Sequence, residues 1–313
     1  MRMKKIVAVL LLLCSCPIFA QSNPLQQTLE GMIQGFKGHV GLFAEDLKTG
    51  RTVAINADEP TQTASVIKLS LMLETFAEIK QGKIKLDDPL PLLKDNQVPG
   101  SGILQFLHAG LNTTVEDNVV LMIELSDNTA TNQLIDKVPL TNVNARLAAM
   151  GLKNTYFYKK VFKKAEGPLP ADQKKFGLGK TTAREMAQLL ESIERCELGA
   201  PDLCHRMIDI LKHQTVQEMI PRFIQSGDTS VEAASVANKT GSLDDVRNDV
   251  AIVYAKSGPI IISAFTWDNA DHRWTPENSA ELLIANAAKA IVEAWSMPPH
   301  TGDSPAASTP PAH

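Results

Sequence analysis

The stretch that decides the fold of this chain is Thr63-Ala64-Ser65-Val66-Ile67-Lys68-Leu69-Ser70. It opens an apolar run that continues to Phe76 and is typical of a buried helix. Ser65 and Lys68 are three residues apart at the start of that helix, so their side chains share one face. A serine hydroxyl becomes a nucleophile when an adjacent base takes its proton, and a buried lysine of lowered pKa can be that base. Alone, the pattern S-x-x-K is short and is better explained by an N-cap followed by a solvated lysine.

Hydrophobic periodicity places strands near the two ends of the chain and helices in the middle. The predicted strands are residues 40–44, 51–56, 234–239, 250–255 and 260–266. Besides the helix that follows Ser65, the predicted helices are residues 25–36, 102–109, 115–125, 129–137, 141–150, 182–195, 201–213 and 276–296. Residues 81–101 form a predicted surface excursion, and residues 151–180 are predicted to be loop-like. This order predicts an α+β fold in which the ends of the chain meet in one sheet, with a site in the cleft beside a second, helical lobe.

The two termini differ in composition from the rest of the chain. Residues 1–20 combine early basic residues, a short apolar run and a final Ala20, which is the pattern of a secretory signal peptide. A lipoprotein signal with Cys16 as the lipid-bearing residue is the alternative. Residues 21–296 are the predicted catalytic domain, and residues 297–313, rich in Pro, Ser and Ala, are predicted to be disordered. We therefore expect a periplasmic or secreted protein without a membrane span.

Charge and cysteine usage exclude several kinds of protein. Without residues 1–20 the chain has 28 basic and 35 acidic residues, a net charge of −7, and no basic stripe with interleaved aromatic residues, so nucleic acid is not an expected partner. The seven histidines are scattered, which predicts no metal site. Cys196 and Cys204 are eight residues apart and are expected to form a disulfide in an oxidising compartment, with two buried thiols as the alternative.

Two further motifs lie where a site could be built. Ser126-Asp127-Asn128 separates two predicted helices, and alone it could be a plain N-cap. Lys239-Thr240-Gly241 ends a predicted strand and is followed by Ser242. A lysine and hydroxyls suit a substrate carboxylate there, and a glycine permits close approach of a ligand. The copy Lys48-Thr49-Gly50 lies in a predicted hairpin and is a turn.

Together and in this order, S-x-x-K, S-D-N and K-T-G form the signature of the penicillin-recognising serine hydrolases. The chain resembles class A β-lactamases in particular, over about residues 25–296. Further matches to that family are Asn132 (the last position of S-D-N-x-x-x-N), Thr181-Thr182-Ala183-Arg184-Glu185-Met186-Ala187 and Asn248-Asp249-Val250-Ala251. The resemblance implies a two-lobed fold: a five-stranded antiparallel sheet with the N- and C-terminal helices packed on it, and an all-helical lobe.

The resemblance also implies a role for each motif residue in catalysis. Ser65 would be the acylated nucleophile and Lys68 would accept its proton. Ser126, assisted by Lys239, would protonate the leaving lactam nitrogen. The backbone N–H groups of Ser65 and Ser242 would hold the oxyanion.

The same resemblance implies the substrate contacts. Asn128 would bind the amide of the substrate side chain. The substrate carboxylate would contact Lys239, Thr240 and Ser242, with Arg247 as a second cation for it.

The loop before the Thr181–Ala187 segment departs from the family pattern E-x-x-L-N. Glu166 and Leu169 match that pattern, but Pro170 replaces the asparagine that would hold the deacylating water. Lys164 and Lys180 stand where the family has an arginine and an aspartate, and two like charges cannot pair. Glu166 is therefore expected either to be the deacylation base or to be a solvated loop residue.

These observations predict a serine β-lactamase that hydrolyses a small-molecule β-lactam, needs no cofactor and is a monomer. One alternative is a penicillin-binding or D,D-peptidase-like enzyme that acts on a peptidoglycan-like substrate and deacylates slowly. The other alternative is a non-hydrolytic domain that senses β-lactams or peptidoglycan.

Overall fold

The computed structural model describes residues 23–165, 167–224 and 236–296. The predicted signal peptide, with the alternative lipid site at Cys16, and the C-terminal tail lie outside the described residues. So does Glu166.

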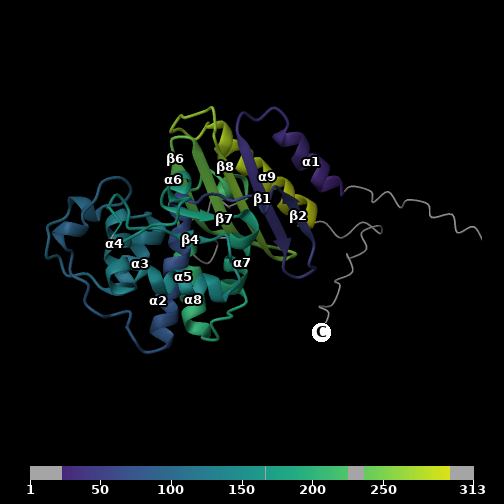
Figure 1. The fold of residues 1–313 in the computed structure, drawn as a ribbon. Coiled ribbons are helices and arrows are strands. Elements are labelled where there is room, and N and C mark those ends of the chain that lie inside the picture. The colour runs from purple at the N-terminus through teal and green to yellow at the C-terminus, as the bar shows by residue number, and fades with distance from the viewer. Residues whose placement is uncertain (1–22, 166, 225–235, 297–313) are drawn as a thin grey trace, which may run out of the picture.

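A five-stranded antiparallel sheet with the order β2-β1-β8-β7-β6 organises the protein (Figure 1). Its strands are β1 (His39–Asp46), β2 (Thr52–Ile55), β6 (Val236–Leu243), β7 (Val246–Ala255) and β8 (Gly258–Trp267). The two ends of the chain meet where β1 pairs with β8, from His39 opposite Trp267 to Asp46 opposite Ile260. The predicted α+β architecture, with the chain ends in one sheet, is confirmed.

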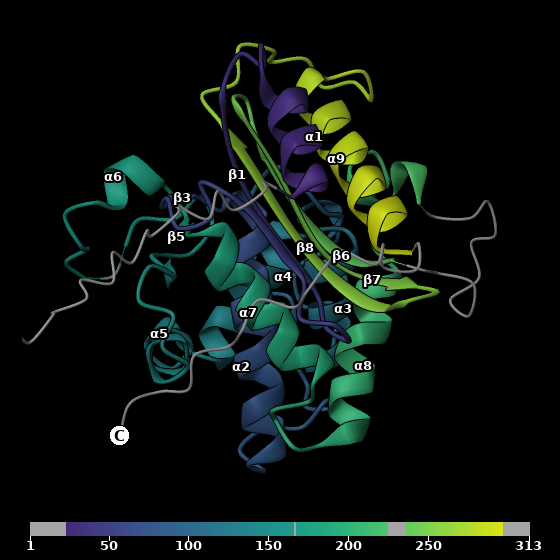
Figure 2. The same cartoon turned by 90° about the vertical axis from the view of Figure 1, so that its right-hand side faces the viewer.

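Two terminal helices cover one face of the sheet, α1 (Pro24–Ile33) and α9 (Ser279–Ser296) (Figure 2). Buried apolar side chains from both helices and from alternate strand positions fill the space between them, among them Leu29, Leu42, Ile262, Ile291 and Trp295. On the other face, α7 (Ala183–Glu194) lies against β1 and β8, and α8 (Pro201–Lys212) lies against β6. Burying apolar surface on both faces makes the sheet the common wall of two cores.

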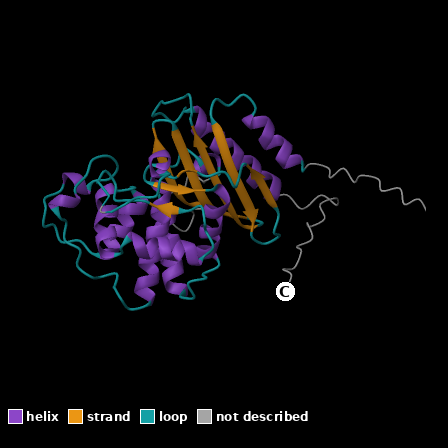
Figure 3. Ribbon diagram, viewed as in Figure 1, coloured by secondary structure: helices purple, strands orange, loops and turns teal. Residues whose placement is uncertain are grey.

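The helical lobe is built around α2 (Lys68–Lys80), whose residues are buried from Lys68 to Glu78. Its neighbours are α3 (Val115–Glu124), α4 (Asn128–Lys137) and α5 (Leu140–Ala149) (Figure 3). The surface excursion carries the short 3₁₀ turn η2 (Lys94–Asn96), and a second turn, η3 (Leu104–Phe106), follows it. The helix predicted for residues 102–109 is only the turn η3, because a residue cluster this short has too few hydrogen bonds to propagate an α-helix.

The prediction that residues 151–180 are loop-like was incomplete. This segment contributes β4 (Tyr156–Phe157), α6 (Gln173–Phe176) and β5 (Gly179–Thr181), and the two strands join β3 (Thr61–Gln62) in a second sheet with the order β3-β5-β4. Strands of two or three residues show no detectable periodicity, so only tertiary pairing reveals them.

The same segment does contain an ion pair, which the sequence reasoning missed. Lys180 Nζ lies 2.7 Å from a carboxylate oxygen of Asp172, and the Tyr158 hydroxyl donates to the other oxygen at 2.8 Å. Lys164 and Lys180 do not pair with each other, but the segment still has an ion pair that holds it. Lys180 at the end of the segment and Asp172 within it form this pair.

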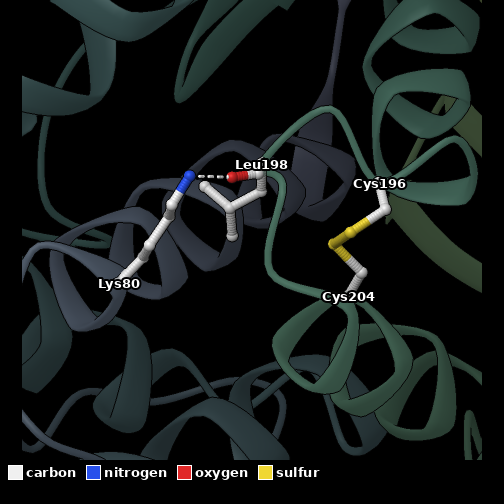
Figure 4. Close-up of a disulfide and its surroundings, with 4 residues drawn as sticks. All are labelled: Lys80, Cys196, Leu198 and Cys204. Carbon is white, nitrogen blue, oxygen red and sulfur yellow. Dashed lines mark hydrogen bonds between the residues drawn. A yellow bond between two sulfur atoms is a disulfide. The ribbon is translucent and has the colours of Figure 1, made fainter.

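Cys196 and Cys204 form the expected disulfide, between the end of α7 and the first turns of α8 (Figure 4). The Lys80 ammonium at the end of α2 donates to the carbonyl oxygen of Leu198 in the same turn. The disulfide and this hydrogen bond together tie the α7–α8 connection to the end of the central helix. Among the described residues, no helix is both long and apolar enough to cross a membrane.

Candidate active site

Ser65 lies in the 3₁₀ helix η1 (Ala64–Ile67), which leads directly into α2. In a 3₁₀ turn, residues three apart eclipse each other, so Ser65 and Lys68 stack on one face more closely than an α-helix would place them. Ala64, just before the serine, has a φ of +45°, a left-handed value that is unusual for a residue with a side chain. Ser65 is partly exposed, whereas Lys68 is completely buried.

The ammonium group of Lys68 has three hydrogen-bond acceptors around it. It donates to the backbone oxygen of Ser126 at 2.6 Å, to the Ser126 hydroxyl at 3.2 Å and to Asn128 Oδ1 at 2.9 Å. A lysine buried at this depth stays in the core only because its polar head is fully paired. These contacts fix its nitrogen between the start of α2 and the turn that precedes α4.

Ser126 occupies that turn, between the end of α3 and the start of α4, with a φ of +53°. Its hydroxyl accepts hydrogen bonds from both buried lysines, Lys68 and Lys239, the second at 3.1 Å. Non-glycine residues held in this left-handed conformation cluster at functional sites, because the surrounding structure must enforce them. The S-D-N and K-T-G motifs, 113 residues apart from Ser126 to Lys239, therefore meet at one oxygen atom.

Asp127 holds the turn in place. One carboxylate oxygen caps α4 by accepting from the N–H groups of Thr129 and Ala130, at 2.8 and 2.9 Å. The other accepts from the N–H groups of Ile103 and Leu104, at 2.7 and 2.9 Å. The simple N-cap interpretation is thus correct for Asp127, and the cap is what orients Ser126 and Asn128. No sequence pattern pointed to the link between Asp127 and residues 103 and 104.

Lys239 belongs to β6, the edge strand next to η1. β6 can approach η1 closely because residue 241 is glycine. A Cβ at Gly241 would lie 2.6 Å from the Thr63 carbonyl oxygen and 2.8 Å from the backbone nitrogen of Ser65. No side chain fits at those distances, so Gly241 brings the strand edge against the Ser65 N–H.

Burial controls the charges in this site. It lowers the pKa of Lys68 well below the ordinary value, and the nearby charge of Lys239 lowers it further, while Asp127 acts in the opposite direction. Burial also lowers the pKa of Lys239 to about 7, against the opposing effect of Asp249. A lysine with so low a pKa can be neutral at physiological pH and can accept a proton. The site therefore contains a candidate base and a second lysine that is close to its titration point.

The predicted binding residues lie around these lysines. Asn128 is buried, accepts from Lys68 and donates to the Pro99 carbonyl oxygen at 3.1 Å. Thr240 follows Lys239 on β6 and is buried, whereas Ser242 is partly exposed at the end of the strand. The three predicted motifs thus come together on η1, the α3–α4 turn and β6.

Arg247 does not join this group. It lies on β7 and pairs with Ser242 of β6, but its side chain turns toward α9. Its guanidinium forms a buried ion pair with Glu281 of α9 at 2.9 Å and stacks on Trp274. With its side chain committed to these contacts, Arg247 is not part of the function proposed below.

Two asparagines, the buried Asn132 and the half-buried Asn144, hold the segment that leads to Glu166 through contacts that the sequence did not reveal. Asn144 of α5 bonds both the N–H and the carbonyl oxygen of Phe157, each at 2.9 Å. Asn132 of α4, which the S-D-N-x-x-x-N pattern did single out, bonds both backbone groups of Val161, at 2.8 and 3.1 Å. The backbone is therefore fixed up to Val161, five residues before Glu166.

The described ranges contain no group of three or more His, Cys, Asp or Glu side chains that could hold a metal ion. The polar groups that meet at Ser126 are hydroxyls, an amide and two ammonium groups. Metals in proteins are held by thiolates, imidazoles and carboxylates or carbonyls, and a pair of lysines disfavours a cation by charge.

We expect substituting Lys239 by arginine to remove a pH dependence. If the charged form of Lys239 contacts the substrate carboxylate, the efficiency of acylation should fall as the pH rises above about 7, because the pKa of this lysine lies there. Arginine stays charged throughout this range. Lys239→Arg should therefore react more slowly overall but with a flat profile between pH 7 and 9, measured as second-order rates of acyl-enzyme formation. An equal decline in both proteins would contradict this role of Lys239.

The fold and the motifs that it brings together define the class of this protein: it is built as a penicillin-recognising hydrolase. The family model described as the β-lactamase enzyme family matches residues 24–295. The chain belongs to the β-lactamase enzyme family, and the predicted resemblance to class A β-lactamases is confirmed.

Individual relatives agree with this assignment. The chain is 26% identical to the carbapenem-hydrolyzing β-lactamase KPC of Klebsiella oxytoca, over 88% of this chain and 90% of the relative. It is 24% identical to the β-lactamase CTX-M-8 of Citrobacter amalonaticus, over 91% and 94%. Among solved structures, a β-lactamase from Sphaerobacter thermophilus superposes with a TM-score of 0.75 at 28% identity, covering 88% of this chain and 98% of that one. PBP-A shares the fold, with a TM-score of 0.74 at 24% identity over 87% and 95%.

Proposed function

We propose that the protein hydrolyses β-lactams through an acyl-enzyme on Ser65. The observation that carries this proposal is the meeting of two buried lysines at the Ser126 hydroxyl, one of them three residues after Ser65. Such an arrangement provides a path for protons beside a nucleophile, as serine acyl transfer requires. Membership of the β-lactamase enzyme family supports a β-lactam as the substrate.

In the acylation step, Ser65 Oγ attacks the lactam carbonyl carbon and gives its proton to neutral Lys68. The C–N bond of the ring then breaks, and the nitrogen takes a proton from the Ser126 hydroxyl. Ser126 is reprotonated by the charged Lys68, because the two are hydrogen-bonded. Within this relay, the structure contains the hydrogen bond between Lys68 and Ser126, and giving up the proton returns Lys68 to its neutral form.

Two backbone N–H groups would stabilise the negative charge that develops on the carbonyl oxygen. The first belongs to Ser65, beside the close approach of Gly241, and the second belongs to Ser242 at the end of β6. Donors that are held in position before the reaction cost no reorganisation, and removing one typically slows catalysis by about 10²–10³. The fixed strand edge supports this assignment.

The substrate would be oriented by one amide contact and one charge contact. Asn128 would bind the amide of the acyl side chain after releasing Pro99, and Lys239 with the hydroxyls of Thr240 and Ser242 would bind the carboxylate. With Arg247 paired to Glu281, Lys239 is the cation proposed for the carboxylate. A charge-assisted contact of this kind supplies orientation as well as affinity.

Deacylation is proposed to be the slow step, with Glu166 as its base. Pro170 has no side-chain amide to hold a water beside that carboxylate. The clamp of Asn132 on Val161 and the Lys180–Asp172 pair tether the two sides of the segment that contains Glu166. A positioned base contributes about 10²–10⁴-fold, and a water that is poorly held should forfeit much of that.

The test follows the intact protein by mass spectrometry after mixing with benzylpenicillin. We expect fast addition of one penicillin mass followed by slow loss, and hence a burst followed by a low steady rate. Glu166→Gln should leave the rate of addition unchanged and lengthen the lifetime of the adduct by about tenfold or more. Lys174, an exposed residue of α6 in the same segment, provides the control, since Lys174→Ala should change neither step.

If Glu166→Gln loses its adduct as fast as the parent chain, Glu166 is only a loop residue and Lys68 becomes the first candidate base. An adduct that never leaves the parent chain would favour the second candidate function, a penicillin-binding or D,D-peptidase-like enzyme. One observation favours that alternative. The residue that Asn132 holds in place is Val161, whose side chain cannot act as a base for deacylation.

We also propose that the chain is exported to the periplasm or secreted, and that it acts as a monomer without a cofactor. The disulfide between Cys196 and Cys204 supports an oxidising compartment. The signal-like composition of residues 1–20 supports export.

A further inference from the structure

Phe162 is an exposed aromatic residue that the mechanism above does not use. It follows Val161, whose side chain is only 6% exposed and whose backbone is clamped by Asn132. Phe162 itself is 67% exposed, so the chain turns from the core to the surface within one residue. The hydrogen bonds of Asn132 to Val161 therefore fix the backbone position from which the Phe162 side chain extends.

The backbone of Phe162 is held in a left-handed conformation, with a φ of +53°. For a bulky residue this conformation is a genuine outlier, and such residues persist where the surrounding structure enforces them. A glycine or an asparagine would adopt the same conformation at lower cost. Strain and the exposure of an apolar ring are two costs at one position, and they suggest that the ring has a use.

The Phe162 ring lies close to Asn128, the residue proposed above to bind the substrate amide. A Cβ placed on Gly100 would be 3.3 Å from Cε2 and 3.9 Å from Cζ of Phe162, and 2.7 Å from Nδ2 of Asn128. The edge of the Phe162 ring and the Asn128 amide, which is proposed to bind the substrate, therefore lie on either side of the same space next to Gly100. Gly100 has a φ of +94°, and the absence of a side chain there keeps that space free of this loop's own atoms.

We propose that Phe162 is a specificity-determining residue: its ring forms the wall of the subsite for the acyl side chain and selects substrates in which that chain is aromatic or otherwise large and apolar. The inference rests on the proposed function and goes beyond it by naming the chemical class that the site prefers. A group attached to the amide that Asn128 binds must pass beside this ring. Aromatic and alkyl groups gain from packing on a phenyl ring, whereas a small acyl group does not reach it.

The experiment compares two penicillins that differ only in this group, benzylpenicillin and the analogue with a methyl group in place of benzyl. The measured quantity is the second-order rate of acyl-enzyme formation. Phe162→Ala should slow the reaction with benzylpenicillin by about three- to tenfold, the usual range for an aromatic contact. The reaction with the methyl analogue should stay within about twofold, and Phe162→Tyr should restore the preference.

Phe223→Ala is the matched control, because Phe223 is also an exposed phenylalanine but lies against Lys289 of α9. It should leave both rates unchanged. Thermal unfolding of each variant checks that the fold is intact.

Equal slowing of both penicillins in Phe162→Ala, or no slowing of either, would overturn the proposed role of Phe162 while leaving the enzyme function standing. Failure of the parent chain to react with either penicillin would instead refute the proposed function, and with it the preference inferred here.

Discussion

Ser65→Ala should abolish covalent labelling of the protein by a fluorescent penicillin. The serine is the partly exposed hydroxyl at the start of the buried helix α2, one 3₁₀ turn before a lysine whose pKa is lowered well below its ordinary value. Alanine keeps the 3₁₀ turn and its neighbour Gly241 but has no oxygen to form the ester. We therefore expect complete loss of labelling, seen in a gel and as the absence of an adduct in the intact mass.

Ser70→Ala is the control for that experiment. Ser70 is a buried serine of the same helix whose hydroxyl donates to the Ile67 carbonyl oxygen at 2.6 Å. Removing that hydroxyl costs a local hydrogen bond and should leave labelling intact. Labelling that survives in Ser65→Ala would mean that another residue is the nucleophile, and the acyl-enzyme proposed here would be incorrect.

Lys68→Met should slow acylation by about 10²–10⁴-fold, the usual contribution of a positioned general base. Methionine has a similar length and suits a buried position, but it cannot accept the serine proton. It also leaves the Ser126 carbonyl and Asn128 Oδ1 without their donor. The rate should be measured as the appearance of the penicillin adduct, together with thermal unfolding to separate lost chemistry from lost structure.

The exposed lysine at the other end of α2, Lys80, provides the comparison (Figure 4). Lys80→Met removes a donor to the Leu198 carbonyl oxygen and should not change the rate of acylation. If Lys68→Met acylates as fast as this control, the proton of Ser65 must be taken by another group. The Ser126–Lys239 pair would then be the remaining route.

Placing both lysines beside the Ser126 hydroxyl affects their protonation. The nearby charge of Lys239 favours the neutral form of Lys68. Burial acts in the same direction on both. The site therefore maintains a lysine that can act as a base at neutral pH.

The sequence by itself determined the class of the protein and most of its secondary structure. The three motifs are local patterns whose residue types are dictated by chemistry, so S-x-x-K, S-D-N and K-T-G could be identified without a structure. Long periodic segments such as α2, α7 and α9 were also predictable, because their apolar faces repeat over many residues. The elements that escaped prediction are short ones, among them β3, β4 and β5, which exist only through pairing with each other, and the four-residue helix α6.

Only the tertiary structure decided how the motifs act together. That Lys68 and Lys239 share the Ser126 hydroxyl depends on the approach of β6 to η1, which Gly241 permits and no local pattern encodes. The lowered pKa values follow from burial, which is a property of the whole fold.

Arg247 shows most clearly that the sequence alone does not determine which side chains face the site. Its type and position suited a carboxylate site, and it pairs with Ser242 of β6, but its guanidinium is bound to Glu281 of α9. That ion pair joins residues 34 positions apart in the sequence, which no local pattern encodes. A motif can therefore name the residues of a site, while the fold decides which of them face it.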